Sequence, residues 1–245
     1  MSFLHAFDLT YPDRASAPDR RQVEQKPDRR FDVVSSDAKA AAPHLSCFFG
    51  PALLKTQRGE VAAQDLSVGD RVLTRDNGYQ TVRWLAHRRV SQDRVSSDRR
   101  FMPIFIPQGA FATFGPERDL WLGPDQRVLF DDGFVELLFG MEQVLLTARD
   151  LDGLWGIERR PAPAAMFDYI HVLTDGHELV QADGLWVETL QPGDPVFSGL
   201  EATTAMSLKR HLAQDGVPSV FPAARTELKA HQVKVLFNAV RQRKN

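Results

Sequence analysis

Short apolar runs that alternate with turn-forming residues fill the middle of this chain, and this pattern limits the fold more than any other feature. The runs RVLT (71–74) and YQTVRWL (79–85) flank an Asp-Asn-Gly triplet, which favours a hairpin because Asn-Gly adopts positive φ at low cost. The Asp-Gly pairs at 175–176 and 183–184 are likewise expected to form turns of two residues or nearly two. Many short strands separated by such turns predict an all-β barrel or sandwich-like body.

The two ends of the chain lack this pattern. Residues 11–40 are rich in Asp, Glu, Lys, Arg and Pro, and they contain too little apolar surface to offset the entropy cost of ordering. We therefore predict a flexible charged leader over residues 1–44. Near the other end, apolar residues recur at helical spacing, which predicts an appendage of one or two helices over 201–245. The last helix is basic, and we interpret its charges as a solvated face near a helix end.

The composition narrows the classes of protein to which the chain can belong. Hydrophobic residues make up 43% and charged residues 25%, and the net charge of −2 favours no nucleic-acid partner. The N-terminus lacks the basic and then apolar sequence of a secretory signal, and the most apolar segment (134–146) is too short for a transmembrane segment. We expect a soluble protein, cytoplasmic by default, with export that needs no signal peptide as the open alternative.

The chain contains one cysteine, Cys47, at the point where the leader gives way to the β pattern. A single cysteine excludes an internal disulfide and any zinc site that begins with a cysteine pair. Composition alone favours a small, buried and unreactive thiol at this position. The alternative is a reactive nucleophile at the edge of a domain, and the surrounding sequence bears on that choice.

Three segments resemble the Hint (Hedgehog/intein) superfamily, in particular bacterial Hint-domain proteins. The stretch CFFGPALLKTQRGEVAAQDLSVGDRVLTRDNGYQTVRWL, which begins at Cys47, resembles the opening block of that family. LWLGPDQRVLF (120–130) and YIHVLTDGHELVQADGLWVET (169–189) resemble its central and closing blocks, in the same order. The resemblance covers about residues 45–200 and implies an all-β Hint fold with two pseudo-twofold halves, in keeping with the similar strings RVLTRDNG and RVLFDDG.

The resemblance also implies a reaction. In this family a cysteine thiol attacks the carbonyl of the preceding residue, so Cys47 would convert the Ser46–Cys47 peptide bond into a thioester by an N–S acyl shift. Thiolate suits this chemistry because it is a strong nucleophile near neutral pH. The thioester would then be hydrolysed or transferred to an acyl acceptor that the sequence does not identify. Such a reaction turns over once, needs no cofactor and uses the protein's own N-terminal leader as substrate in cis.

The chain departs from the family at two functional positions. The Thr or Ser and the His of the central block are replaced by Gly123 and Gln126. A glutamine amide cannot deliver a proton near neutral pH, and the loss of a general acid costs about 10²–10⁴-fold in rate. The His-Asn pair that ends an intein falls on Glu188 and Thr189, which offer no side-chain amide to cyclise. We therefore expect impaired self-processing and no intein-type splicing.

Two histidines complete the candidate site. His177 matches the histidine that inteins often have in the closing block, and His171 falls where many inteins have Asp. If both lie on adjoining strands beside the Asp-Gly turn at 175–176, either could serve as acid or base for Cys47; the alternative is two structural strand residues. A zinc site formed by these three residues would lack a fourth ligand, so no metal is predicted.

The catalytic candidates are thus Cys47, His177, His171 and Gln126, with the carbonyl of Ser46 as the point of attack. Two functions stay open at this point. One is a self-processing module that Gly123 and Gln126 impair, and the other is a decayed Hint domain that serves as a binding or structural module. If Gln126→His, alone or with Gly123→Thr, switched cleavage on, decay would be supported.

Overall fold

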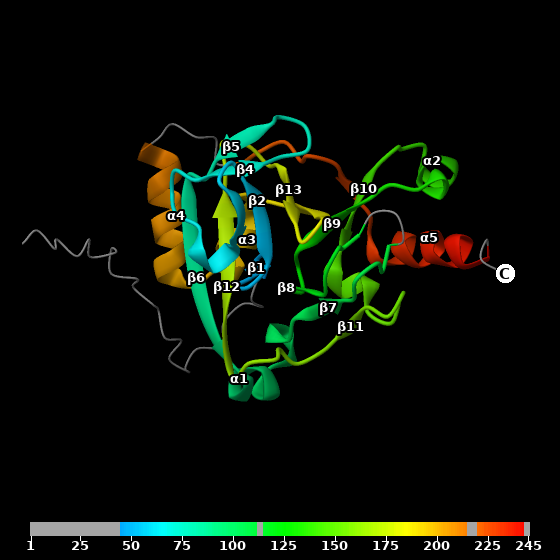
Figure 1. The fold of residues 1–245 in the computed structure, drawn as a ribbon, viewed down its shortest axis with the longest axis horizontal. Coiled ribbons are helices and arrows are strands. Elements are labelled where there is room, and N and C mark those ends of the chain that lie inside the picture. The colour runs from blue at the N-terminus through cyan, green and yellow to red at the C-terminus, as the bar shows by residue number, and fades with distance from the viewer. Residues whose placement is uncertain (1–44, 112–114, 215–219, 243–245) are drawn as a thin grey trace, which may run out of the picture. The chain divides into compact units, whose positions relative to one another are not determined.

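Two largely antiparallel β-sheets form the body of the chain (Figure 1). The computed structural model describes residues 45–111, 115–214 and 220–242, all of which belong to one compact unit. The predicted leader, residues 1–44, lies outside the described residues. The predicted all-β class is confirmed, since strands form most of the regular structure and the helices are few and mostly short.

The first sheet has six strands in the order β11-β7-β8-β1-β12-β6. These strands are Phe48–Phe49 (β1), Trp84–Ser91 (β6), Ile104–Ile106 (β7), Leu120–Leu122 (β8), Glu158–Arg159 (β11) and Met166–Leu173 (β12). The long strands β6 and β12 pair along their whole length, and Figure 1 shows them side by side. Strand β1 lies between β12 and β8, where Phe48 is opposite Ile170 on one side and Leu122 on the other. The residue after Cys47 is therefore fixed inside a sheet.

The second sheet has the order β15-β10-β9-β14-β13-β2-β4-β5, and β3 pairs with β2 outside this path. These strands are Leu53–Thr56 (β2), Gly59–Ala62 (β3), Arg71–Leu73 (β4), Tyr79–Thr81 (β5), Arg127–Phe130 (β9), Val144–Thr147 (β10), Leu179–Ala182 (β13), Leu185–Glu188 (β14) and Thr226–Glu227 (β15). All neighbours are antiparallel except β10 and β15, which are parallel. The edge strand β15 comes from the C-terminal segment.

Five α-helices accompany the sheets in the described residues. They are Gln92–Ser97 (α1), Gly133–Phe139 (α2), Asp194–Gly199 (α3), Ala202–Gln214 (α4) and Ala230–Gln242 (α5). The two longest, α4 and α5, lie where helices were predicted near the C-terminus. Helix α2 was not predicted; Asp132 accepts a hydrogen bond from the Phe134 amide at its start, and Gly140 ends it in the left-handed conformation. None of the described helices combines the length and apolar character that crossing a membrane requires.

The predicted turns fall into two groups. The Asn77–Gly78 signal is confirmed as a hairpin between β4 and β5, closed by a 2.8 Å bond from the Thr74 amide to the Gly78 carbonyl. Asp183 and Gly184, both with positive φ, join β13 to β14 in two residues, as predicted. The prediction for residues 175–176 was wrong, because this segment connects β12 of the first sheet to β13 of the second. His171 and His177 therefore do not lie on adjoining strands.

Apolar side chains from both sheets form the main core, which includes Leu54, Ile104, Val128, Val144 and Ile170. The C-terminal segment adds Leu228, Val233 and Leu236 to the same core. A second cluster surrounds Cys47, and a third joins Trp84 to Leu208 and Leu212 of α4. The predicted helical appendage is thus packed against the sheets by buried leucines and valines.

Candidate active site

Cys47 lies directly before β1, and its side chain is completely buried. Side chains alternate along an extended chain, so Ser46 and Phe48 point to one face of the sheet and Cys47 and Phe49 to the other. On that second face the thiol belongs to an apolar cluster with Phe49 and Tyr169. Burial raises the pKa of the Cys47 thiol well above its ordinary value, although the positive charge of Arg88 lowers it. The resting thiol is therefore protonated near neutral pH.

His171 contacts the bond that the sequence predicts to be cleaved. Its Nδ1 lies 2.9 Å from the carbonyl oxygen of Ser46, and both residues are buried. Because a carbonyl oxygen can only accept, Nδ1 carries the proton and donates it. The register of β1 on β12, extended by one residue from the Phe48–Ile170 pair, places Cys47 opposite His171 on one face. The Ser46–Cys47 peptide bond thus has a hydrogen-bond donor on its carbonyl oxygen and the chain's one thiol on its next residue.

Two backbone hydrogen bonds hold the chain on both sides of this bond. The amide of Leu45 donates to Oδ2 of Asp125 at 2.8 Å, and Asp125 also forms an ion pair with Arg149. The amide of Gly123 donates to the carbonyl of Cys47 at 3.0 Å. Leu45 is itself completely buried. Leu45 and Ser46, directly upstream of Cys47, are therefore held within the domain.

Gly123 lies directly against this segment, and only glycine fits there. A Cβ atom at this position would lie 2.1 Å from the carbonyl oxygen of Leu45 and 2.5 Å from Sγ of Cys47. These approaches are far inside van der Waals contact, so the backbone would have to move to admit any side chain. Gly123→Thr would therefore displace this segment, so Gln126→His alone is the cleaner form of the test for decay.

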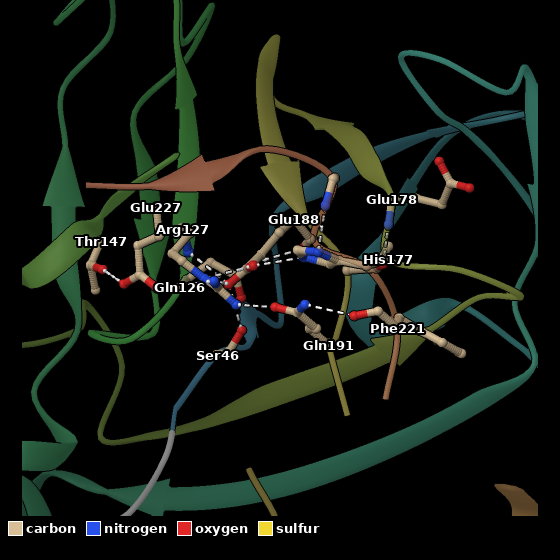
Figure 2. A network of polar contacts seen from close by, with 12 residues as sticks. Ser46, Gln126, Arg127, Thr147, His177, Glu178, Glu188, Gln191, Phe221 and Glu227 are labelled. Atoms are coloured by element: carbon tan, nitrogen blue, oxygen red, sulfur yellow. Dashed lines mark hydrogen bonds and ion pairs between the residues drawn. The ribbon is translucent and has the colours of Figure 1, made fainter. Parts of the chain in front are cut away.

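A buried carboxylate, Glu188, holds Ser46 from the opposite side of the strand. Its Oε1 accepts hydrogen bonds from Oγ of Ser46 and Nε of Arg127, both at 2.9 Å, and its Oε2 accepts one from Nε2 of His177 at 2.8 Å. Figure 2 shows these side chains converging on the carboxylate. Burial acts to raise the pKa of Glu188, but the His177 hydrogen bond and the Arg127 charge outweigh it, so the pKa lies below its ordinary value. Glu188 is ionised near neutral pH.

His177 supports Glu188 and, among the residues that the structure describes, makes no hydrogen bond to Ser46 or Cys47. Its Nδ1 accepts a hydrogen bond from the amide of Ala224 at 3.0 Å, so the ring proton is on Nε2, which donates to Glu188. The two candidate histidines therefore have different surroundings. His171 lies on the carbonyl of Ser46, whereas His177 is fixed between β14 and the C-terminal segment.

Gln126 also serves this network. Its Nε2 donates to the backbone carbonyl of Glu188 at 2.7 Å, and the side chain is buried (Figure 2). Arg127, the next residue, extends the network to Gln191 and Glu227, at 3.1 Å each. Gln126 thus orients the strand that carries Glu188 and has no hydrogen bond to the Ser46–Cys47 bond in the described residues.

The structure brings Ser46, Cys47 and His171 together, and it joins Gln126 and His177 to the same site through Glu188. Sequence reasoning missed Glu188 and Asp125 as site residues. A signal for Glu188 existed, since a carboxylate at the end of the apolar run GLWVE needs a buried partner. No local pattern pointed to the contact of Asp125 with Leu45. Among the residues that the structure describes, no group of three or more His, Cys, Asp or Glu is arranged to hold a metal ion.

Comparison with solved structures finds inteins and an intein-like domain among the similar proteins. The chain is similar to the crystal structure of the gp41-1 intein, with 13% identity, a TM-score of 0.35 and coverage of 59% of this chain and 98% of that one. It is also similar to an AceL NrdHF class 3 split intein variant, with 11% identity, a TM-score of 0.39 and coverage of 59% and 97%. For a bacterial intein-like domain from Clostridium thermocellum the identity is 13%, the TM-score 0.41 and the coverage 60% and 99%.

The sequence itself assigns the family. No curated protein matches the chain. The family model of the Hint domain, however, matches residues 46–194, which is more than half of the chain. This range begins at the residue before Cys47. It includes His171, Glu188 and the side chains that hydrogen-bond to the Glu188 carboxylate. The chain belongs to the Hint-domain family.

Proposed function

We propose that this protein cleaves its own backbone between Ser46 and Cys47 by an N–S acyl shift. Sγ of Cys47 attacks the carbonyl carbon of Ser46, the C–S bond forms and the C–N bond breaks. The thiol proton ends on the Cys47 nitrogen, which becomes a free amine, so the step is an isomerisation. Water or an outside nucleophile then takes the acyl group, which releases residues 1–46 and regenerates the thiol.

The contact between His171 and the Ser46 carbonyl is the observation that carries this proposal. A donor at 2.9 Å polarises the carbonyl and stabilises the negative charge that its oxygen gains when the thiol attacks. His171 would therefore act on the electrophile, and not as the acid or base for Cys47 that the sequence suggested. This role needs the proton on Nδ1, which the carbonyl contact itself favours.

Burial of the upstream residues supports the same proposal. Leu45 and Ser46 are both buried, and Asp125 and Glu188 hold them by hydrogen bonds. Such contacts fix the reacting carbonyl relative to the thiol, which lowers the entropy cost of the attack. A segment that only linked a leader to a domain would have no need for burial or for these hydrogen bonds. The contacts of Leu45 and Ser46 therefore favour a role for this segment in the reaction.

Intact-mass measurement of the full chain tests the proposal. We expect hydroxylamine or dithiothreitol to release residues 1–46, slowly at pH 7 and faster toward pH 9, because the thiol pKa is raised and the thiolate fraction grows with pH. Cys47→Ala should abolish this release, whereas His171→Ala, which removes the donor to the carbonyl, should slow it by about 10²–10³-fold. Release that continued in Cys47→Ala would refute the mechanism.

A second function is favoured by one set of observations. Gly123 leaves no room for the family hydroxyl, Gln126 bonds to Glu188 instead of the scissile bond, and the thiol is protonated at rest. These features suit a decayed domain that serves as a binding module. A wild-type chain that stayed intact under every condition of the mass experiment would support this function. A cavity of about 500 Å³ whose lining includes Arg75 and Trp186 would then be the first surface to probe with ligands.

A further inference from the structure

Arg88 is a largely buried cation beside the apolar cluster that contains Cys47, and the mechanism above does not use it. Its side chain is only 11% exposed, and its Nε lies 3.2 Å from Oε1 of Glu201. Its guanidinium carbon lies 4.7 Å from the centre of the Phe101 ring, which belongs to the same apolar cluster as Cys47. The Nε and Nη1 atoms are both buried and form no hydrogen bond with the residues that the structure describes, so the Nε contact with Glu201 is an ion pair only.

The strand register places Arg88 and Cys47 on one face of the first sheet. Arg88 is opposite Tyr169, and Tyr169 is opposite Phe49, so the three side chains form a row across β6, β12 and β1. Cys47 precedes Phe49 by two residues and therefore points to the same face. The guanidinium and the thiol thus project into one apolar cluster, where water does not screen a charge.

From this arrangement we infer that Arg88 stabilises the thiolate form of Cys47 and that Glu201, by pairing with Arg88, limits how strongly it does so. The inference rests on the proposed function only in that the thiolate is the nucleophile of the acyl shift. Arg88 takes up no proton, since an arginine stays charged in proteins. It acts through Cys47, by lowering the energy of the anion that exists before the C–S bond forms.

Other ionisable groups around the thiol have different partners. Tyr169 donates its hydroxyl to the carbonyl of Phe101 at 2.9 Å, and burial raises its pKa well above the ordinary value. His171 donates to the Ser46 carbonyl, and Arg159 of β11 acts on Tyr169. Arg94 of α1 lies over the Phe101 ring at 4.6 Å. Arg88 is thus the cation best placed to offset the effect of burial on the thiol.

The source of Glu201 makes this pair informative. Glu201 directly precedes α4 and lies beyond residues 46–194, the range of the Hint-domain match. Burial lowers the pKa of Arg88, and the negative charge of Glu201 raises it in return. The segment after the matched domain therefore supplies the charge that compensates Arg88. The position of this segment relative to Arg88 would therefore set the reactivity of the Cys47 thiol.

The single cysteine allows a direct test in the full chain. Protein labelled with ¹³C at the cysteine Cβ gives one NMR signal, whose shift follows ionisation of the thiol as the pH rises, and intact mass confirms that each sample is uncleaved. We expect Arg88→Gln to raise the midpoint of this titration by about one pH unit. Arg88→Lys should retain most of the wild-type midpoint because it keeps the charge. Glu201→Gln should lower the midpoint, since it removes the anion that neutralises Arg88.

Arg89→Gln is the matched control. Arg89 is the next residue on β6, points to the opposite face and pairs with Asp168 at 3.0 Å, so its removal should leave the midpoint unchanged. Equal midpoints in Arg88→Gln and Arg89→Gln would overturn the inference. A thiol that stayed protonated in wild type and in Glu201→Gln throughout the pH range of the folded state would overturn it as well.

The mass experiment separates this inference from the proposed function. A wild-type chain that never releases residues 1–46, but whose thiol midpoint responds to Arg88, would reject self-processing and leave the charge pair standing. A wild-type chain that releases the leader, but whose midpoint ignores Arg88, would reject the charge pair and leave self-processing standing. If both hold, hydroxylamine cleavage should be slower in Arg88→Gln and faster in Glu201→Gln at pH 7.

Discussion

The peptide bond between Ser46 and Cys47 is held by a small number of side chains, each with one clear task. His171 donates to the carbonyl, Glu188 holds the serine hydroxyl, and Gly123 lets the loop before β9 approach the backbone. The absence of a side chain at 123 matters as much as the presence of the other two. This segment of the chain could not lie against Leu45 and Cys47 if it carried even a methyl group.

Gly123→Ala tests this packing at the level of one atom. We expect it to lower the free energy of unfolding by about 1–3 kcal/mol, because the added Cβ forces the scissile segment or the loop to shift. Gly133→Ala is the matched control: nothing lies within 4 Å of its Cβ position at the start of α2, so it should be neutral or slightly stabilising. Urea denaturation measures both, and equal effects of the two changes would contradict the packing argument.

At the scale of elements, the site is assembled by the register of three strands and by the approach of the two sheets. The pairing of β1 with β12 sets His171 opposite Cys47, and the pairing of β12 with β6 adds Arg88 to the same face. Strand β14 of the second sheet carries Glu188 to the other side of Ser46. A shift of β1 by one residue would exchange these faces and separate the thiol from both His171 and Arg88.

The link between the two sheets at Glu188 predicts a pH dependence of stability. The folded-state pKa of Glu188 is lowered, so its contribution is present above the unfolded pKa of about 4.3 and is lost as the pH falls through the folded value. Glu188→Gln should cost about 3–5 kcal/mol at pH 7, because it leaves Arg127 without its buried partner. The difference from wild type should stay constant above about pH 5 and shrink as the pH falls below about 4.3 in urea titrations.

Glu227→Gln is the control for this experiment. Glu227 pairs with the same arginine, but it is 45% exposed, so its loss should cost less than about 1 kcal/mol at pH 7. Equal costs for the two variants, or a Glu188→Gln cost that did not change with pH, would show that the buried carboxylate does not contribute its charge to stability.

At the scale of the molecule, the C-terminal segment completes both the core and the site. It contributes the edge strand β15, the amide of Ala224 on His177 and the carboxylate of Glu201 on Arg88. Figure 1 shows α5 beside β9 and β10 of the second sheet, and its apolar side chains join the main core. The Hint-domain match ends before all of these residues. In this protein the matched domain and the segment after it pack as one compact unit.

Leu236→Ala tests this integration. Leu236 of α5 is buried in the main core, so its truncation should lower the free energy of unfolding by about 2–5 kcal/mol. Val235→Ala removes a neighbouring side chain that is 51% exposed and should change it by less than about 0.5 kcal/mol. In urea denaturation we expect one cooperative transition, whose midpoint falls to a lower urea concentration in Leu236→Ala. Loss of only a separate minor transition would mean that the segment folds independently.

Local patterns in the sequence determined several features of this protein. Asn77–Gly78 and Asp183–Gly184 specified two hairpins, because residues that form turns at low cost can be recognised locally. The helical spacing of nearby apolar residues specified α5, which is also a local signal. The blocks around Cys47 were sufficient to identify the Hint family and its β class. The predicted catalytic roles stay predictions until cleavage is measured.

Only the tertiary structure decided how the site is built. Ser46 and Glu188 are 142 residues apart, and Leu45 and Asp125 are 80 apart, so no local pattern could pair them. The sequence offered both histidines as acid or base for Cys47. Strand register instead brings His171 to the Ser46 carbonyl, and the connection between the two sheets brings His177 to the Glu188 carboxylate. The physical reason is that a hydrogen bond depends on where a side chain points in space, and strands far apart in the sequence set that direction only after they pair.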